Sequence, residues 1–299
     1  MRESTLNDEK EREMDLWLNI LIGCLVVGLM GVFSVKAKIV STSGLIAGAV
    51  VGLIVWIFGG WAWFMLILIF HLSAAMFTKV KYERKARQGL AQEKGGARAW
   101  QNVMANGGFP TICAAIEGIL VLLSIGFTLD IFLFGFIGGI ATMCADTIST
   151  EVGLLSKTQP RLITHLGQSV PAGTSGGVTI LGELGALTGS VLIGAPAWLL
   201  AGVGLLTIPF SNIPVTFTYQ LLIAAVGAGM FGSFIDSIFG ATIQGIFKCK
   251  VCGKITEKAK HCGEKSIYQK GVAFFENNMV NFTAAVAGGL FAMGLYFLF

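Results

Sequence analysis

Long apolar segments, each close to the length that crosses a membrane, dominate this chain. A helix needs about 20 mostly apolar residues to cross the hydrocarbon core of a bilayer. Apolar residues make up 54% of the 299 residues and charged residues 13%, whereas soluble domains are about 25% charged. We therefore expect an all-α, polytopic transmembrane helix bundle of about eight spans that forms a single integral membrane domain. The predicted spans are residues 16–35, 39–58, 61–77, 109–126, 131–145, 178–208, 219–243 and 279–299.

Small residues and one proline refine this prediction of the spans. The 40 glycines are small enough to let transmembrane helices approach closely. The third and fifth segments are short, so each is expected to be tilted, re-entrant or extended into a neighbouring polar segment. The sixth is long and contains Pro196. A kink or break is expected there, because proline lacks the backbone N–H of a helical hydrogen bond.

Lysine and arginine are distributed unevenly among the loops. The loops at residues 36–38, 78–106, 153–177 and 244–278 carry two, seven, two and seven of the 21 basic residues. Residues 1–15 carry the other three, beside six acidic residues. By the positive-inside rule, the four basic loops are cytoplasmic and both termini lie outside. The chain is thus expected in the cell membrane, with residues 244–278 as a cytoplasmic, cysteine-containing loop between the last two spans.

Asp146 begins a polar run at the end of the fifth predicted span. In a helix, Asp146, Ser149, Thr150 and Gly153 fall on one face because they are three or four residues apart. A charge at membrane depth costs about 2.5–3.5 kcal/mol on insertion scales and usually has a use. A carboxylate beside hydroxyl groups suits a Mg²⁺–phosphate group. The run therefore predicts a magnesium site, and the alternative is a polar helix end at the membrane interface.

Glycines dominate the segment Gly-Thr-Ser-Gly-Gly at residues 173–177, which leads into the next apolar segment. Glycine lets the backbone present successive N–H groups, and a helix N-terminus would add partial positive charge. The segment is not a Walker A loop, because no Lys-Ser or Lys-Thr follows the glycines. It predicts a phosphate-binding loop or, equally, a plain loop in which Thr174 or Ser175 caps the helix.

Two further runs place polar side chains beside the spans. Asp236, Gly240 and Gln244 form one stripe of a helix. Close helix packing would explain the glycine but not the aspartate, so Asp236 is predicted to be functional. Arg98 and Asn106 share a face just before the fourth span, and arginine suits bidentate phosphate binding. The remaining lysines and arginines of these loops are assigned to membrane orientation.

The loop at residues 244–278 contains Cys249, Cys252, His261 and Cys262. Three cysteines and one histidine make up a common type of structural zinc site, and disulfides are disfavoured in the cytoplasm. The adjacency of His261 and Cys262, however, would strain a tetrahedral site. The cluster therefore predicts either structural zinc or a set of reduced thiols in a basic loop.

The order of these runs resembles the transmembrane protein 19-like family of integral membrane proteins. That family includes plant phytyl-phosphate kinase, which phosphorylates an isoprenyl monophosphate to the diphosphate with a nucleoside triphosphate, CTP being favoured. Where the family commonly has Ala-Ser-Glu, this chain has Ser149-Thr150-Glu151, which keeps a hydroxyl group. The resemblance rests on Thr-Lys-Val-Lys at 78–81, Gly-Gly with Arg and Gln at 95–101, Ala-Asn-Gly-Gly at 105–108, Ala-Asp-Thr at 145–147, the glycine segment at 173–177, Gly-Ser with Asp-Ser at 232–237 and Asn-Asn with Val-Asn at 277–281.

The runs and the resemblance together predict a Mg²⁺-dependent membrane phosphotransferase that converts a polyprenyl monophosphate, of phytyl or geranylgeranyl type, to its diphosphate with CTP. The alternative is a membrane transporter or lipid translocator, which the acids Glu117 and Glu183 within the spans would fit. The lipid bilayer and the isoprenyl phosphate are the expected partners, no nucleic acid is expected, and the oligomeric state stays open. The expected catalytic residues are Asp146, Glu151, Asp236 and Arg98, with Asp146 and Asp236 as Mg²⁺ ligands; the expected phosphate- and nucleotide-binding residues are Lys79, Lys81, Gln101, Asn106, Gly173, Thr174, Ser175, Gly176, Gly177, Ser237, Asn278 and Asn281.

Overall fold

The computed structural model describes residues 2–125, 130–211 and 213–299. Within these ranges, eight helices are long and apolar enough to cross a membrane, which confirms the predicted all-α transmembrane bundle. Two predicted features lie outside the described part: the end of the fourth span at residue 126 and the acidic side chains of residues 1–15. The eight helices are α1 (Arg2–Lys36), α2 (Thr42–Gly59), α3 (Trp61–Lys79), α5 (Trp100–Leu122), α6 (Asp130–Gly153), α7 (Ile180–Gly202), α8 (Tyr219–Thr242) and α9 (Asn277–Tyr296).

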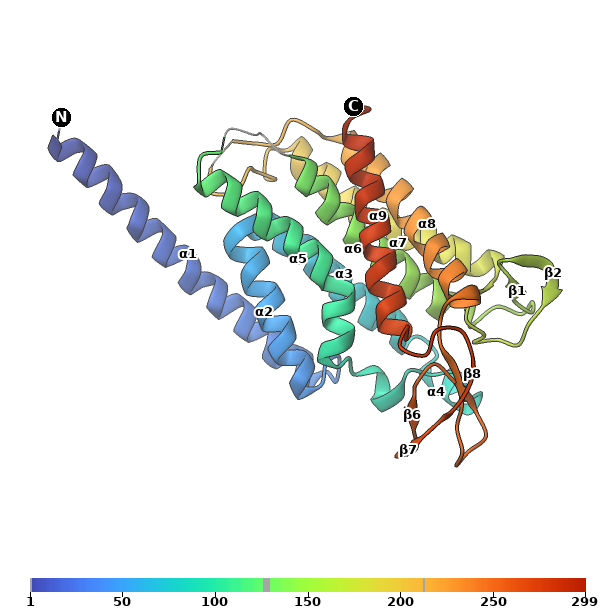
Figure 1. The fold of residues 1–299 in the computed structure, drawn as a ribbon. Coiled ribbons are helices and arrows are strands. Elements are labelled where there is room, and N and C mark those ends of the chain that lie inside the picture. The colour runs from blue at the N-terminus through green and yellow to red at the C-terminus, as the bar shows by residue number, and fades with distance from the viewer. Residues whose placement is uncertain (1, 126–129, 212) are drawn as a thin grey trace.

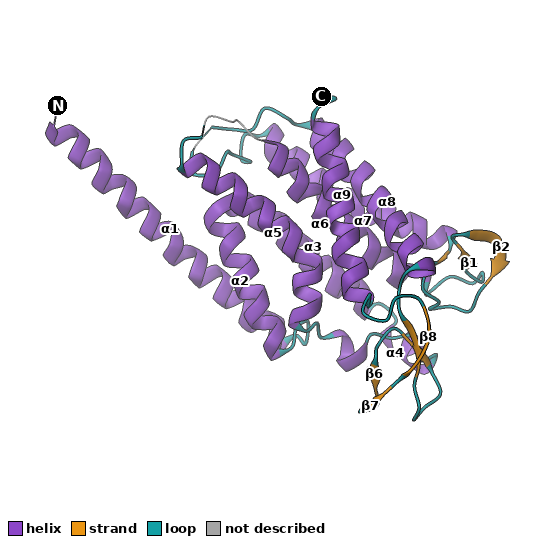
Figure 2. Ribbon diagram, viewed as in Figure 1, coloured by secondary structure: helices purple, strands orange, loops and turns teal. Residues whose placement is uncertain are grey.

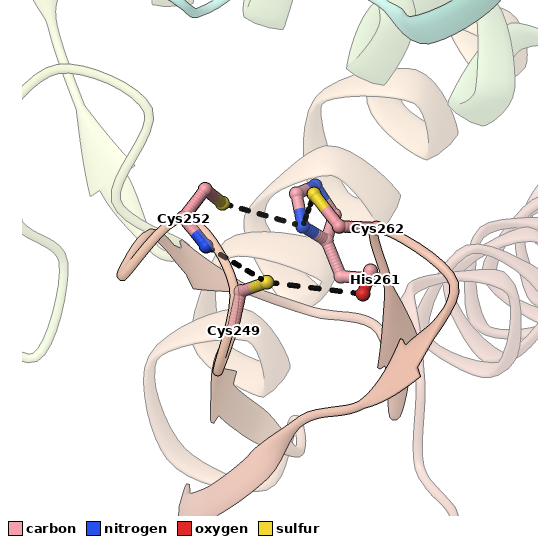
Figure 3. Close-up of side chains that lie close together, drawn as sticks. All are labelled: Cys249, Cys252, His261 and Cys262. Carbon is pink, nitrogen blue, oxygen red and sulfur yellow. Dashed lines mark hydrogen bonds between the residues drawn. The ribbon is translucent and has the colours of Figure 1, made fainter.

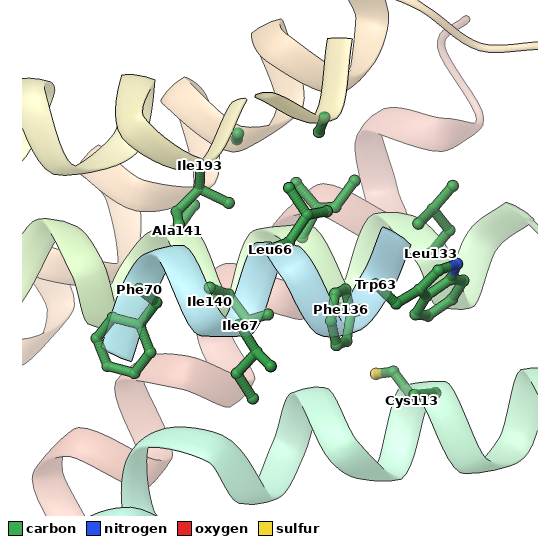
Figure 4. Packing of buried hydrophobic residues seen from close by; sticks show 14 of the residues in the cluster. Trp63, Leu66, Ile67, Phe70, Cys113, Leu133, Phe136, Ile140, Ala141 and Ile193 are labelled. Atoms are coloured by element: carbon green, nitrogen blue, oxygen red, sulfur yellow. The ribbon is translucent and has the colours of Figure 1, made fainter. Parts of the chain in front are cut away.

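Helix α6 is the centre of the bundle and contacts α3, α5, α7, α8 and α9. Its neighbours come close because small residues lie at the crossings: a Cβ atom on Gly138 would lie 2.5 Å from the Cβ of Ala292 on α9. Large side chains fill the remaining space, and the rings of Trp63 on α3 and Phe136 on α6 have centroids 4.7 Å apart (Figure 4). Helix α1 instead lies at the edge of the bundle and packs on α2 (Figure 1).

Four helices differ from the predicted spans, and the first is α1, which begins at Arg2 instead of residue 16. Helix α5 begins at Trp100 instead of residue 109, and α6 continues to Gly153 instead of ending at residue 145. Both extensions carry polar side chains that line a cavity within the protein, so apolar content alone does not mark these helix ends. Of the kink or break expected at Pro196, the break is wrong, because α7 continues through this residue from Ile180 and ends at Gly202 instead of residue 208.

All four basic loops lie at one end of the bundle, and both termini lie at the other (Figure 1). The end with the basic loops also carries the short helices α4 (Tyr82–Arg87) and η1 (Glu93–Gly96), which lie between α3 and α5 in the chain. The two longest loops contain small antiparallel sheets, in the strand orders β2-β1-β3 and β5-β4-β8, and a two-stranded sheet β6-β7 (Figure 2). The strands are β1 (Arg161–Leu162), β2 (His165–Ser169), β3 (Gly177–Val178), β4 (Ile246–Lys248), β5 (Ile255–Thr256), β6 (Lys260–His261), β7 (Glu264–Lys265) and β8 (Ile267–Lys270).

Candidate functional site

A polar cavity of about 690 Å³ opens at the loop end of the bundle, between α5, α6, α8, α9 and the two β-containing loops. Its volume is within the range of small-molecule binding sites in proteins. Every residue predicted to be catalytic or to bind phosphate or nucleotide lines this cavity, except two lysines. Those that line it are Arg98, Gln101, Asn106, Asp146, Glu151, Gly173, Thr174, Ser175, Gly176, Gly177, Asp236, Ser237, Asn278 and Asn281.

Asp146 on α6 and Asp236 on α8 both line this cavity, and their carboxylates lie close enough for each to act on the other. The Oδ1 atom of Asp236 is buried and has no hydrogen-bond partner among the described residues. Two carboxylates this close repel each other unless a proton or a cation lies between them. Hard oxygen ligands of this kind are those that Mg²⁺ prefers. The pair and its unpartnered oxygen therefore fit a divalent cation, and their role as Mg²⁺ ligands stays a prediction.

A third carboxylate, Glu257, joins the pair from the loop between β5 and β6. The hydroxyl of Ser175 donates a hydrogen bond of 2.5 Å to its Oε1 atom, and its charge acts on both Asp146 and Asp236. Burial raises the pKa of Glu257, and hydrogen bonds from Ser175 and Gln244 oppose this shift. Three acids thus converge on one side of the cavity.

Sequence reasoning missed Glu257 because it occurs in a polar, basic stretch that looks like an ordinary solvated loop. One signal could have identified it. Glu257 lies midway between Cys252 and His261, so any fold that brings the cysteine cluster together makes the intervening loop compact and places it beside the last two spans.

Arg98 supplies positive charge opposite the acids. Its backbone is held against the loop between α1 and α2, because its N–H donates to the carbonyl of Ile39 over 2.9 Å and its own carbonyl accepts from the N–H of Ser41 over 3.0 Å. Burial lowers the pKa of Arg98, and the nearby carboxylates of Glu151 and Asp146 oppose this shift. Arg98 is therefore a positioned cation that faces a cluster of carboxylates.

Glu151 lines the cavity, but it also forms an ion pair with Lys85 of α4, and both side chains are almost fully buried. The ammonium group of Lys85 donates a further hydrogen bond of 2.9 Å to the carbonyl of Thr78. Lys85 therefore has a structural role that its sequence context, which indicated membrane orientation alone, did not predict. The pair joins α4 to the loop end of α6.

The glycine loop at residues 173–177 packs directly against α8. A Cβ atom on Gly176, where φ is +75°, would lie 2.6 Å from the carbonyl oxygen of Ser237 and 2.5 Å from the Cβ of Ala241. The expected capping role of Thr174 or Ser175 is wrong. The strand β3 follows the loop, and Thr179 caps α7 by accepting a hydrogen bond of 3.0 Å from the N–H of Gly182. The glycines let the loop approach the acid-bearing helix closely.

Amide side chains line the part of the cavity between α5 and α9. Asn281 donates a hydrogen bond of 3.1 Å from Nδ2 to Oδ1 of Asn106, and both residues are buried. Gln244 and Asn277 form a similar pair at 3.5 Å. These neutral donors and acceptors extend the polar surface without adding charge.

The structure does not bring Lys79 and Lys81 to the cavity. The ammonium group of Lys79 donates a hydrogen bond of 2.5 Å to the carbonyl of Ala37 in the loop between α1 and α2. Lys81 is exposed and has a left-handed backbone, with φ of +48°, at the start of α4. Their predicted phosphate-binding role therefore has no support from the geometry.

An apolar groove adjoins the polar cavity. It has a volume of about 120 Å³ and lies between α1, α2, α3 and α5, with Gly48 and Phe64 among its lining residues. Arg98, Asn102 and Asn106 line both the groove and the polar cavity. The two spaces thus meet at one cation and two amides, which is an arrangement suited to a molecule with an apolar tail and an anionic head.

The structure brings the predicted cysteine cluster together in the loop between α8 and α9 (Figure 3). The ligand atoms of Cys249, Cys252, His261 and Cys262 all lie within 4.8 Å of one another. Among the described residues, this is the one group of three or more histidine, cysteine and acidic side chains close enough to hold a metal ion by that measure.

Comparisons with known proteins place this geometry in context. Residues 25–289 match the family of integral membrane proteins designated DUF92. Protein PGR of Arabidopsis thaliana is 32% identical over 280 residues, which cover 89% of this chain and 92% of that protein. An uncharacterized membrane protein of Methanocaldococcus jannaschii is 26% identical, covering 95% of this chain and 97% of that protein. Protein VTE6, chloroplastic, of A. thaliana is 28% identical over 204 residues, which cover 68% of this chain and 56% of that protein. No solved structure matches the chain.

Proposed function

The chain belongs to the DUF92 family of multi-pass integral membrane proteins, and from this premise we propose that it phosphorylates a polyprenyl monophosphate to the diphosphate. The nucleoside triphosphate is the phosphate donor, and CTP is favoured. The donor and the lipid class come from the resemblance to a family that includes plant phytyl-phosphate kinase. Membership of DUF92 confirms that family resemblance.

One observation carries the proposal: the acid-lined polar cavity and the apolar groove share Arg98, Asn102 and Asn106. The apolar groove of about 120 Å³ would hold the part of a prenyl tail next to the phosphate, with the rest of the tail in the bilayer, and the phosphate would then lie against the guanidinium group of Arg98. Arginine binds phosphate strongly because two of its N–H groups can donate in parallel. The remaining polar cavity leaves room for the triphosphate beside the acids.

The transfer itself requires positioning and charge neutralisation more than a strong base. An anionic oxygen of the lipid phosphate attacks the γ-phosphorus of the nucleotide, and the bond from that phosphorus to the bridging oxygen breaks. The products are the lipid diphosphate and the nucleoside diphosphate. A proton acceptor is unnecessary, because the attacking oxygen is already ionised.

The residues of the cavity divide this work between them. Asp146 and Asp236 would hold Mg²⁺, which neutralises and orients the phosphate oxygens of the nucleotide. Arg98 would stabilise the negative charge that builds up on the transferring group, an effect that is strong where water is excluded. The glycine loop at residues 173–177 would place backbone groups near the phosphates, since it packs on the helix that carries Asp236.

A transporter or lipid translocator is the alternative function. The acids that motivated it, Glu117 and Glu183, line neither the polar cavity nor the apolar groove. The Oε2 atom of Glu117 is buried without a hydrogen-bond partner among the described residues, which is the observation that favours a transport role.

The test is turnover by detergent-purified protein with Mg²⁺, CTP or ATP, and a panel of prenyl monophosphates, read as lipid diphosphate by mass spectrometry. We expect diphosphate from wild-type protein and a loss of activity in Asp146→Asn, with Glu183→Gln as the matched control outside the cavity. The proposal is wrong if Asp146→Asn keeps its activity. It is also wrong if no pair of substrates turns over while proteoliposomes show flux of a prenyl phosphate.

A further inference from the structure

We propose that Cys249, Cys252, His261 and Cys262 bind a structural Zn²⁺ ion that holds Glu257 in the polar cavity. The metal site stands independently of the proposed function, whereas any part of Glu257 in catalysis rests on it. The four ligands come from two β-hairpins: Cys249 and Cys252 lie in the turn between β4 and β5, and His261 and Cys262 lie at the turn between β6 and β7.

The distances between ligand atoms fit tetrahedral zinc. Zn–S and Zn–N bonds of about 2.3 and 2.0–2.1 Å place neighbouring ligand atoms roughly 3.6–3.8 Å apart in a tetrahedron. The Nδ1 atom of His261 lies 3.6 Å from Sγ of Cys252 and 3.2 Å from Sγ of Cys262 (Figure 3). All four ligand atoms lie within 4.8 Å of one another, so shifts of about 1 Å or less would complete the geometry, and the exposed Cys252 and Cys262 are free to make them.

The backbone of both turns favours thiolate ligands and the adjacent His-Cys pair. The N–H groups of Val251 and Cys252 donate to Sγ of Cys249 over 3.4 and 3.5 Å, and hydrogen bonds to the charged form stabilise a thiolate. Cys262 has φ of +53°. This left-handed conformation turns the chain so that neighbouring His261 and Cys262 point to the same place, as two adjacent ligands of one metal ion must.

Apart from Ile246 and Phe247 of β4, which are buried, the loop buries little apolar surface. Val251, Ile255, Ile267 and Tyr268 are exposed, and each of its strands has two to four residues. Small units with so little buried apolar surface usually require a metal or disulfides to be stable. Soft sulfur ligands with one imidazole, arranged as a tetrahedron, select zinc over magnesium or calcium.

The metal would also shape the polar cavity. Cys252 and His261 are both ligands, so the segment between them, residues 253–260, would be fixed at both ends. Glu257 lies in this segment, accepts the hydrogen bond of 2.5 Å from Ser175 and lines the cavity. Lys258 and Lys260 line the same cavity. Zinc binding would therefore fix the side of the cavity that the loop between α8 and α9 supplies.

The test begins with the metal content of the protein, purified in detergent through a tag that binds no metal. We expect about one zinc ion per chain, as in a closed four-ligand site, and visible absorption bands of tetrahedral cobalt–thiolate after exchange with Co²⁺. Cys252→Ser and Cys262→Ser should lose the zinc, while Cys24→Ser, which changes an exposed cysteine of α1, should keep it. Zinc-free wild-type protein, or a disulfide between these cysteines, would overturn the proposal.

Hydrogen–deuterium exchange separates a structural role from chance binding and does not depend on the variants folding. Removal of zinc from wild-type protein with a chelator should raise exchange in residues 249–262 and leave the spanning helices unchanged. Unchanged exchange in this segment would contradict the structural role. Glu257→Gln should keep its zinc whether or not the protein is a kinase, so the metal site can be judged without any measurement of turnover.

Discussion

The ammonium group of Lys85 on α4 pairs with the carboxylate of Glu151 on α6, and both side chains are almost fully buried. This contact ties the short helix outside the bundle to the end of the central span. It also neutralises a carboxylate that would otherwise add to the negative charge of Asp146, Asp236 and Glu257. Glu151 therefore acts on the site by holding its wall in place.

Lys85→Met should destabilise the protein. Removal of one partner of a buried ion pair costs about 3–5 kcal/mol because the other charge is left unpaired. Thermal unfolding in detergent would show this as a clear loss, with Lys81→Met, at an exposed position, as the unchanged control. The double variant Lys85→Met/Glu151→Leu should recover most of the loss. If the fall in melting temperature of the double variant equals the sum of the falls in Lys85→Met and Glu151→Leu, the two side chains do not act as a pair.

Asp236→Asn should lower turnover and raise thermal stability in the absence of magnesium. Turnover falls because one cation ligand is lost, and a fall of about 100-fold or more is typical when a group that stabilises charge is removed. Stability rises because Asp146 no longer faces a second carboxylate. Measurement of turnover and of melting temperature on the same preparation checks the expected fall in the first and rise in the second, with Glu183→Gln as control. A drop in both quantities would mean that Asp236 holds the fold and not the cation.

Gly176→Ala should weaken the use of nucleotide. The position has φ of +75°, and the added Cβ atom would lie 2.6 Å from the carbonyl oxygen of Ser237. A left-handed residue other than glycine costs roughly 1–2 kcal/mol, a factor of about 5–30, so KM for CTP should rise by about that factor. Gly167→Ala is the matched control, because a Cβ atom there meets nothing within 4 Å. Equal KM values for the two variants would argue against a role for the glycine loop in nucleotide binding.

Gly48→Phe should discriminate between substrates by chain length. Gly48 lines the apolar groove, and a Cβ atom there meets nothing within 4 Å, so the ring would occupy the groove. KM should rise for a long prenyl monophosphate and change little for a short one. Gly28→Phe on the neighbouring α1 is the control, since this glycine lies outside the groove. An equal effect on long and short substrates would place the tail elsewhere.

Periodicity and charge predicted the spans and most of the functional candidates that line the polar cavity. Asp146, Ser149 and Gly153 do line one cavity, because a helical face is set by residue spacing alone. The shared end of the four basic loops also followed from their charges (Figure 1). Both features follow from residue spacing or charge within one segment, so they can be predicted without knowing which segments contact each other.

Features that depend on contacts between distant segments were not predictable in the same way. Charge counts treat Lys79, Lys81 and Lys85 alike, yet Lys85 alone among these three turns inward, because Glu151 lies opposite it across 66 residues of chain. Glu257 reaches the acids because two hairpins fold back together. The cap of α7 lies at Thr179 and not in the glycine loop, because residues 177–178 form strand β3, which pairs with β1, before the helix begins.

The most direct test of the central claim follows the γ-phosphate itself. Purified protein is incubated with Mg²⁺, geranylgeranyl monophosphate and CTP labelled at the γ-phosphorus, and the lipid and nucleotide products are separated. The account predicts labelled lipid diphosphate and an equal amount of unlabelled CDP from wild-type protein and Glu183→Gln, with neither from Asp146→Asn or Asp236→Asn. Label that stays in CTP or appears as free phosphate, with none in the lipid, would contradict it.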